Sequence, residues 1–391
     1  MFFNKNKYLP YGKHSITKAD IKGVIRTLKS DFLTQGPLVP EFEKNICQKV
    51  SSDYAVAVNS ATSALHIACL ALDLKPEEYV WTSPISFVAS SNCALYCGAK
   101  IDFIDINPNT GLIDENLLEN KLKKAATENK LPKILIPVHL AGTSCNMEEI
   151  YKLSKKYNFK IIEDASHALG GKYKDKPIGN CQFSNITVFS FHPVKMITTG
   201  EGGVATTNDK FLFEQMKKLR CHGITKNKNE FRLNQEGKWH YEQNILGFNY
   251  RLSDLHASLG ISQLKRLDKI VKKRNELLNF YKTISQNLEI SFLEIPEDCL
   301  SSVHLAILKL NNFNPNAHKT IFNKMRANNI GIQLHYIPIH LQPFYRNMGF
   351  KVGDFPNSEF YAQNSFSIPL FTDLKRRHQI RVISTLKEVL I

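Results

Sequence analysis

The chain has 391 residues, of which 43% are hydrophobic and 22% charged, so it is a globular protein too long for one ordinary core. Its formal net charge of +15 would favour an anionic ligand, but the lysines lie along helical patterns that lack the interleaved aromatic residues of single-strand nucleic-acid binders. The eight cysteines form no CxxC pair, no apolar run could cross a membrane, and the start shows no signal-peptide pattern. We expect a cytoplasmic protein with reduced thiols that binds no metal, nucleic acid or membrane.

In the first two-thirds of the chain, short apolar runs alternate with helical patterns. Helical patterns occupy 62–72 and 87–98, and the apolar runs are 54–58, 79–83, 100–106, 133–142, 159–170, 185–191 and 202–208. Strands that are apolar on both faces are typical of a mostly parallel sheet covered by helices. The pattern therefore predicts an α/β fold for this part.

The pattern changes after residue 251. Residues 252–288 predict one long helical stretch with little punctuation. Beyond it come the apolar runs 304–310 and 331–339, a helix near 316–329 and a final helix. We therefore predict a large domain, 1–265, followed by a smaller α+β domain, 266–391.

Two polar segments follow predicted strands of the large domain. After the strand 54–58, "NSATSAL" starts a helix near Thr62, and the free N–H groups of a helix start attract phosphate. The alternative is that Ser60 is only the N-cap of that helix. In "IIEDASHALG", Asp164 ends a strand and His167 follows. The carboxylate either pairs with a cation in the crevice of the sheet or is again only a helix cap.

A third segment, "FSFHPVKMITTGEGG", brings Ser190 and Lys195 to the end of another apolar strand. Burial lowers the pKa of a lysine, and a neutral amine is a nucleophile. A phosphate site, a carboxylate and a nucleophilic lysine are together what pyridoxal 5′-phosphate requires: donors for the phosphate, an acid beside the ring nitrogen and an amine for the aldehyde. We therefore expect these three strand ends to form one coenzyme site.

Nearly the whole chain resembles the DegT/StrS-type nucleotide-sugar aminotransferases, which have the fold type I architecture of aspartate aminotransferase. The resemblance rests on "LTQGPLVPEFE", "NSATSAL", "SPISFVAS", "EDASHALG", "SFHPVKMITTGEGG", "NYRLSDLHASLGISQL" and "HYIPIH", in this order. Relatives that dehydrate sugars carry histidine at the position of Lys195, so the lysine indicates a transaminase.

The resemblance implies roles for the residues of these motifs. Lys195 would hold the coenzyme covalently and move a proton, and Asp164 would bond the ring nitrogen. Phe87 would stack on the ring, and His167 would lie beside the ring hydroxyl. The phosphate would be held by Ala61, Thr62 and Ser190.

The resemblance also implies a homodimer in which Asn249 of one chain contacts the phosphate in the other chain's site. Two segments would line the sugar pocket. One is amino-terminal, the other is the loop 335–340. Their candidate residues are Tyr11, Asp31, Phe32, Leu33, Thr34, His335, Tyr336, Ile337 and Pro338.

The implied reaction transfers the amine of glutamate to the 4-keto carbon of a UDP-linked 6-deoxy sugar. The D-sugar epimer or another nucleotide 4-keto sugar is the alternative substrate, since no motif fixes the epimer. Two other classes remain open. One is a regulatory protein on the same fold without turnover. The other is a metal hydrolase built on His139, Asp164, His167 and His192, although no HExxH-type spacing supports it.

Overall fold

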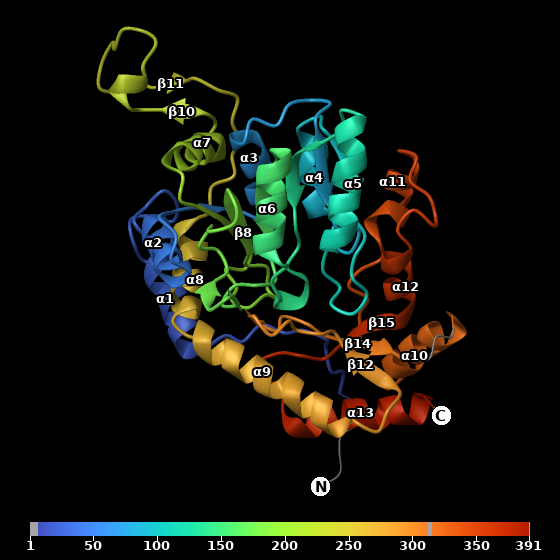
Figure 1. Cartoon of the computed structure of the whole chain (residues 1–391). Coiled ribbons are helices and arrows are strands. Elements are labelled where there is room, and N and C mark those ends of the chain that lie inside the picture. The colour runs from blue at the N-terminus through green and yellow to red at the C-terminus, as the bar shows by residue number, and fades with distance from the viewer. Residues whose placement is uncertain (1–6, 312–314, 391) are drawn as a thin grey trace.

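A seven-stranded sheet forms the centre of the larger part of the molecule (Figure 1) in the computed structural model, which describes residues 7–311 and 315–390. From one edge to the other its strands are β1 (Tyr54–Val58), β9 (Gly203–Thr207), β8 (Ile186–Ser190), β5 (Lys160–Asp164), β4 (Pro132–Ile136), β2 (Tyr79–Thr82) and β3 (Lys100–Phe103). Neighbours from β8 to β3 pair in parallel, whereas β9 is antiparallel to both β1 and β8. The predicted mostly parallel α/β sheet is confirmed.

Helices cover both faces of this sheet. One face packs against α3 (Ala61–Ala71), α4 (Ala89–Tyr96) and α7 (Lys210–Arg220); the other packs against α2 (Leu38–Val50), α5 (Glu115–Thr127), α6 (Met147–Tyr157) and α8 (Asp254–Leu264). In β1, Val56 and Val58 pack in the core on the first side, and Ala55 and Ala57 in the core on the second. Every second residue of a strand points to the same face, so the strand sequence alone decides which layer each side chain meets.

The carboxyl ends of β1, β2, β5 and β8 meet at one edge of the sheet. The four strands run in the same direction because β1 and β8 are both antiparallel to the β9 strand between them. The three polar segments predicted from the sequence, and the segment that follows β2, therefore leave the sheet at a common edge. Ligands of open α/β sheets bind at such an edge.

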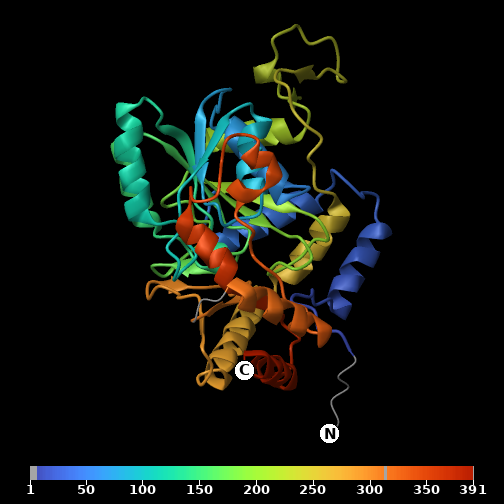
Figure 2. The same cartoon turned by 90° about the vertical axis from the view of Figure 1, so that its right-hand side faces the viewer.

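A second, smaller core lies beside this edge. It contains a three-stranded sheet of β12 (Ile290–Phe292), β14 (Ala306–Leu310) and β15 (Ser365–Ile368), with α10 (Pro315–Ala327), α12 (Pro356–Asn364) and α13 (Arg376–Leu390) around it. Figure 2 shows these elements gathered below the large sheet, close to the C-terminus. The predicted domain boundary near residue 265 stays a prediction.

The helix α9 (Leu267–Ile284) packs in both cores. Leu267 and Val271 belong to the core of the large sheet, whereas Leu277 and Tyr281 belong to the core of the small one. One continuous helix therefore joins the two parts (Figure 1).

The prediction of a single helical stretch over 252–288 is wrong, because α8 ends at Leu264 and α9 begins at Leu267. The break lies at Arg266, whose guanidinium donates to Asp20 Oδ2 at 2.7 Å and to the carbonyl of Ser15 at 3.3 Å. Asp20 belongs to α1 (Lys18–Leu28), which packs along α8. A contact with a helix more than 200 residues earlier thus sets the end of α8.

The remaining elements are short. They are β6 (Lys172–Tyr173), β7 (Lys176–Pro177), β13 (Cys299–Leu300), β10 (Ile224–Thr225), β11 (Glu242–Gln243), α11 (Pro343–Arg346) and three 3-10 helices, Leu140–Gly142, Lys228–Glu230 and Ile339–Leu341. The β10–β11 arm projects from the body of the molecule in both views (Figures 1 and 2). Within the described residues, none of the helices has the length and apolar character needed to span a bilayer. Residues 1–6, part of the start in which we expected no signal peptide, lie outside the described residues.

Asp254 should be essential for the packing of α8. Its buried carboxylate accepts the backbone N–H groups of Gly36 and Leu38, both at 2.8 Å, and so fixes the start of α2. Because the Asp254→Ala variant leaves two partly buried donors without their charged acceptor, we expect its free energy of unfolding to fall by about 3 kcal/mol in urea titrations. The control is Asp268→Ala, whose exposed carboxylate pairs with Lys49 and should contribute less than about 1 kcal/mol. Equal losses in the two variants would contradict this account.

Candidate active site

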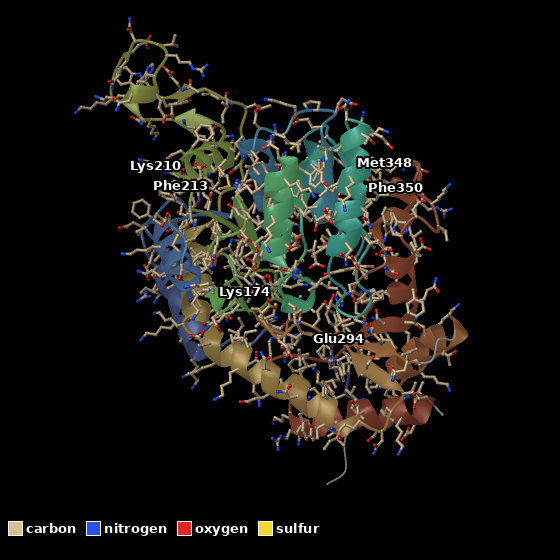
Figure 3. All side chains as sticks on the ribbon, viewed as in Figure 1. Lys174, Lys210, Phe213, Glu294, Met348 and Phe350 are labelled. Atoms are coloured by element: carbon tan, nitrogen blue, oxygen red, sulfur yellow. The ribbon has the colours of Figure 1, made fainter. Side chains whose placement is uncertain are left out.

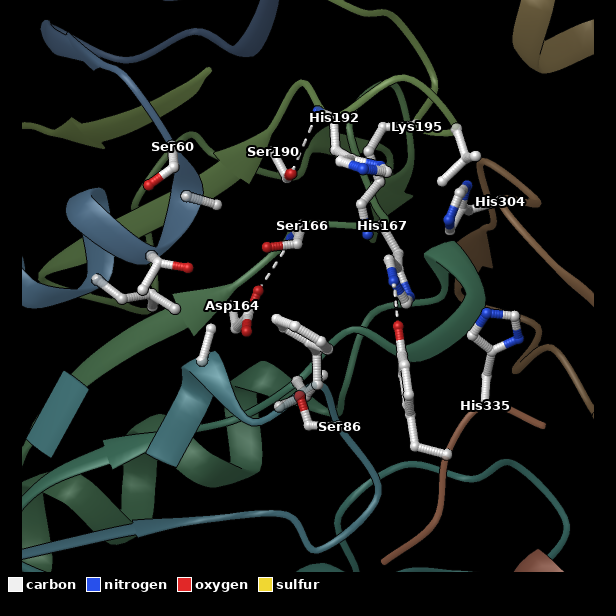
Figure 4. A pocket seen from close by; sticks show the side chains of 18 of the residues that line it. Ser60, Ser86, Asp164, Ser166, His167, Ser190, His192, Lys195, His304 and His335 are labelled. Carbon is white, nitrogen blue, oxygen red and sulfur yellow. Dashed lines mark hydrogen bonds between the residues drawn. The ribbon is translucent and has the colours of Figure 1, made fainter. Parts of the chain in front are cut away.

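A cavity of about 440 Å³ lies at this edge of the large sheet, between the two cores (Figure 4). Its size is that of a small-molecule site. Side chains at the ends of strands of the large sheet meet side chains of residues 304 and 333–336, which lie beside the three-stranded sheet. Ten of the residues singled out in the sequence line it: Tyr11, Ala61, Thr62, Phe87, Asp164, His167, Ser190, Lys195, His335 and Tyr336. The three predicted strand ends therefore converge on one cavity.

The start of α3 forms one wall of the cavity. Ser60 is the N-cap, and its hydroxyl accepts the N–H of Ser63 at 3.1 Å. The N–H groups of Ala61 and Thr62 have no carbonyl acceptor inside the helix, because they lie in its first turn. A Cβ at Gly203 would lie 2.5 Å from the nitrogen of Ala61, so only glycine lets β9 approach the helix start this closely. The N-cap role of Ser60 is confirmed, while the binding of a phosphate by the free donors of this helix start stays a prediction.

The carboxylate of Asp164 enters the cavity from the end of β5. Asp164 has the same strand parity as Ile162, which packs in the core beneath α3 and α4, so its side chain points to that face. Its Oδ2 accepts the hydroxyl proton of Ser90 at 2.6 Å, and its Oδ1 accepts the N–H of Ser166 at 3.1 Å. The carboxylate is thus buried, bonded on both oxygens and fixed in orientation.

Lys195 lies in the turn between β8 and β9, where its N–H donates to the carbonyl of His192 at 2.9 Å. Burial lowers the pKa of its ammonium group from 10.5 to about 8, and the nearby negative charge of Asp164 partly opposes this shift. Across residues 7–311 and 315–390, no carboxylate forms an ion pair with Lys195. The amine is therefore available as a nucleophile close to neutral pH.

His167 is held in one tautomer. Its Nδ1 accepts the N–H of Ala141 at 3.3 Å, so the proton of the neutral ring lies on Nε2, which donates to the hydroxyl oxygen of Tyr336 at 3.2 Å. Burial, and then the positive charge of Lys195, lowers the pKa of His167 well below its usual value. A neutral imidazole and a phenol thus stand together on this side of the cavity (Figure 4).

Two further histidines stand near Lys195 and are also neutral. Burial lowers the pKa of His335 to about 3, and it lowers the pKa of His304 well below the usual range. His335 Nδ1 lies 2.8 Å from the hydroxyl of Ser367, but His304 Nδ1 is buried without a hydrogen-bond partner in the described structure. His304 was not singled out from the sequence, where it looked like the first residue of an apolar strand.

Phe87 presents an aromatic face to the cavity. Its side chain is 60% exposed although it lies between two domains, and its ring centroid is 6.4 Å from that of Tyr336. An aromatic ring left this open can cover the face of a flat ligand.

Several predicted residues do not line this cavity. They are Asp31, Phe32, Leu33, Thr34, Asn249, Ile337 and Pro338. Thr34 pairs with Ser253 near the start of α8, and Asn249 is exposed on a segment whose backbone pairs with Cys221. Their roles stay predictions.

The polar residues Ser86, Ser90 and Ser166 were missed as well. Ser86 and Ser166 line the cavity, and Ser90 lies directly behind Asp164. Ser86 and Ser90 belong to the quoted motif "SPISFVAS", but nothing in its spacing indicated which serine would reach the carboxylate.

Metal ligation has no geometric support in the described residues, where no three His, Cys, Asp or Glu side chains are arranged to hold an ion. His139, one of the four residues of the hydrolase hypothesis, is buried outside the cavity and bonded to Glu163 at 2.7 Å. The eight cysteines are free thiols.

Comparison with known proteins agrees with this geometry. The model of the DegT/DnrJ/EryC1/StrS aminotransferase family matches residues 14–387. The UDP-4-amino-4,6-dideoxy-N-acetyl-β-L-altrosamine transaminase of Campylobacter jejuni is 39% identical over 384 residues, which cover 98% of this chain and 97% of that protein. Among solved structures, the Helicobacter pylori aminotransferase PseC, involved in the biosynthesis of pseudaminic acid, is 31% identical with a TM-score of 0.89 and covers 98% of this chain and 99% of its own. The PLP-form of the "putative sugar aminotransferase Spr1654" from Streptococcus pneumoniae is 28% identical with a TM-score of 0.87 over 98% of both chains.

The lowered pKa of Lys195 predicts the pH at which its amine reacts. Below about pH 8 the amine is mostly protonated and reacts slowly, so in protein dialysed free of carbonyl compounds its acetylation rate should rise with pH and reach half its maximum near pH 8. Peptide-resolved mass spectrometry measures this rate. Lys100, whose pKa is raised above 10.5 by the hydrogen bond that it donates to Glu77, is the internal control. The same midpoint for both lysines would contradict the assigned shift.

Proposed function

Because the chain belongs to the DegT/DnrJ/EryC1/StrS aminotransferase family, whose coenzyme is pyridoxal 5′-phosphate, we propose that it transfers the amine of glutamate to the 4-keto carbon of a UDP-linked 6-deoxy-N-acetyl hexosulose. One observation carries the proposal. The amine of Lys195, the carboxylate of Asp164 and the open start of α3 face a single cavity. These are the three groups that this coenzyme needs.

The residues of the cavity fit the coenzyme group by group. The free N–H groups of Ala61 and Thr62, with the hydroxyl of Ser190, are placed to bind a phosphate. Asp164 is fixed on both oxygens and is suited to a ring nitrogen, which it would keep protonated. Phe87 is open for stacking on the ring.

When bound, the coenzyme supplies an electrophilic carbon for amines and a ring that stabilises negative charge after a proton leaves. The chain supplies the proton transfer. With a pKa near 8, the amine of Lys195 can accept a proton and return it to another carbon at close to neutral pH. His167 stays neutral, so it positions polar groups through Nε2 without adding a second cation beside Lys195.

The substrate class follows from the relatives. The C. jejuni relative is named for a UDP-4-amino-4,6-dideoxy sugar of the β-L-altrosamine series, and the H. pylori structure for pseudaminic acid synthesis. We assign the same product to this chain, with Tyr11, His335 and Tyr336 at the sugar. Residues 31–34, Ile337 and Pro338 would form more distant parts of the sugar and nucleotide pocket. The D-epimer is the alternative substrate, and a homologue without turnover is the alternative class. The free thiols favour a cytoplasmic reaction.

The proposed assembly is a homodimer with shared active sites. Asn249 is exposed and does not line the cavity of its own chain. A residue that completes the phosphate site of a second copy would have this position. The exposed apolar side chains Ile21, Ile25 and Leu28 lie on the outer side of α1 at successive turns, which supports a covered surface.

The proposed reaction predicts a yellow protein whose colour bleaches with glutamate and returns with a UDP-4-keto-6-deoxy sugar. The experiment offers the L- and D-series sugars separately, and NMR of the products reports the stereochemistry. The Lys195→Ala variant should lose turnover by at least about 10³-fold, because it lacks both the amine and the proton carrier.

Lys174→Ala is the matched control, because Lys174 is an exposed lysine paired only with Glu148 on the outside of the molecule (Figure 3). This variant should keep its colour and rate. A colourless wild-type protein, or near-normal turnover in Lys195→Ala, would refute the aminotransferase reaction. Equal rates for both sugar series would refute only the assigned epimer.

Shared sites predict complementation between an inactive variant and an impaired one. Asn249→Ala should reduce turnover about tenfold or more, by loss of a hydrogen bond to a charged phosphate. In mixed dimers of Lys195→Ala and Asn249→Ala, one site combines an intact Lys195 with the partner's intact asparagine. Random mixing should therefore restore about a quarter of the wild-type rate. If Asn249 acts within its own chain, mixing restores nothing.

A further inference from the structure

We propose that Ser90 is a positioning residue for Asp164: its hydroxyl, held in turn by Ser86, orients the carboxylate that would serve the ring nitrogen of the coenzyme. This inference rests on the proposed function, since it requires that the coenzyme binds at Asp164. It adds two residues of α4 and of the preceding loop to the site, neither of which the sequence identified.

The three side chains form a buried chain of short hydrogen bonds. Ser90 Oγ lies 2.6 Å from Asp164 Oδ2, and Ser86 Oγ lies 2.6 Å from Ser90 Oγ. The side chain of Ser90 is fully buried, and those of Ser86 and Asp164 are nearly so. Water therefore competes little for these bonds, and each is stronger than it would be at the surface.

The direction of each bond follows from the number of protons. Ser90 has one hydroxyl proton and three oxygens within reach: Asp164 Oδ2 and Ser86 Oγ, both at 2.6 Å, and the carbonyl oxygen of Phe87 at 3.4 Å. The carboxylate is the charged acceptor, so the hydroxyl of Ser90 donates its hydrogen bond to Asp164. The oxygen of Ser90 is then free to accept, so Ser86 donates to it. The chain runs from Ser86 through Ser90 to Asp164.

Two properties of Asp164 depend on this chain. First, the bond from Ser90 to Oδ2 and the bond from the Ser166 N–H to Oδ1 define the plane of the carboxylate, which leaves its remaining lone pairs in fixed directions. Second, a donated hydrogen bond favours the charged form of a carboxylate over the neutral one, so the bond from Ser90 would support an interaction between Asp164 and a protonated ring nitrogen.

The same short segment also places Phe87. This residue lies between Ser86 and Ser90 in the sequence and presents its exposed ring to the cavity. One loop and the first turn of α4 thus orient the aromatic cover of the ring and the partner of its nitrogen together.

The test compares Ser90→Ala with Ser91→Ala. Ser91 is the next residue of α4, is equally buried and loses a hydrogen bond to Tyr345 instead of one to Asp164. Two quantities are measured on each purified variant: the dissociation constant of pyridoxal 5′-phosphate, and the pH midpoint of the absorbance change of the bound coenzyme. Thermal melting of the coenzyme-free variants checks that each is folded.

In Ser90→Ala we expect about tenfold weaker coenzyme binding and an upward shift of the absorbance midpoint by about half a pH unit or more. Without the hydroxyl of Ser90, Asp164 would hold less positive charge on the ring of the coenzyme. The nitrogen that joins Lys195 to the coenzyme would then keep its proton to a higher pH, so the shift is upward. Ser90→Thr, which keeps the hydroxyl, should restore both quantities towards the wild type. Ser91→Ala should leave the midpoint unchanged.

Ser86→Ala provides a second test, which remains decisive if a substitution at Ser90 does not fold. It should move the midpoint in the same direction by less, and the double variant should resemble Ser90→Ala alone, because Ser86 acts only through Ser90. An unchanged midpoint in Ser90→Ala, or in Ser86→Ala where Ser90→Ala does not fold, would overturn the inference. A wild-type protein that shows no coenzyme absorbance would instead overturn the proposed function.

Discussion

The carboxylate of Asp164 and the amine of Lys195 share one cavity without forming an ion pair in the described structure, and the rest of the site depends on this separation. A direct pair would keep the amine charged and occupy the carboxylate. Instead, burial lowers the pKa of the lysine, and two donors other than the lysine satisfy the carboxylate. Each group therefore remains available to a different end of a flat ligand placed between them.

Strand register maintains this separation. Asp164 of β5 lies opposite Val188 of β8 in parallel pairing, two residues before the end of β8 at Ser190. Lys195 comes from the turn that β8 makes before β9 returns beside it. Because both strands are central in the sheet and covered on both faces, their ends cannot slip by one residue without turning buried side chains outwards.

Much of the site was predictable because it lies where regular elements end. Asp164, Ser190 and Ser60 are polar residues at or just after the end of an apolar run. Strands that run in the same direction bring such residues together at one edge of the sheet. Long-range contacts were not predictable in this way. The break at Arg266 depends on Asp20, and the bond from Ser90 to Asp164 joins residues 74 positions apart. His304 gave no signal because a neutral histidine beside an apolar strand looks like any other core residue.

The helix α9 has a mechanical consequence for the cavity. Its 18 residues form a rod about 27 Å long that contributes to both cores, and it joins them alongside the segment that follows Leu9, which also lies in the small core. Rotation of one part against the other would have to bend this rod or pull its apolar side chains out of a core. By packing in both cores, this helix restricts changes in the spacing between the strand ends and the His335–Tyr336 wall.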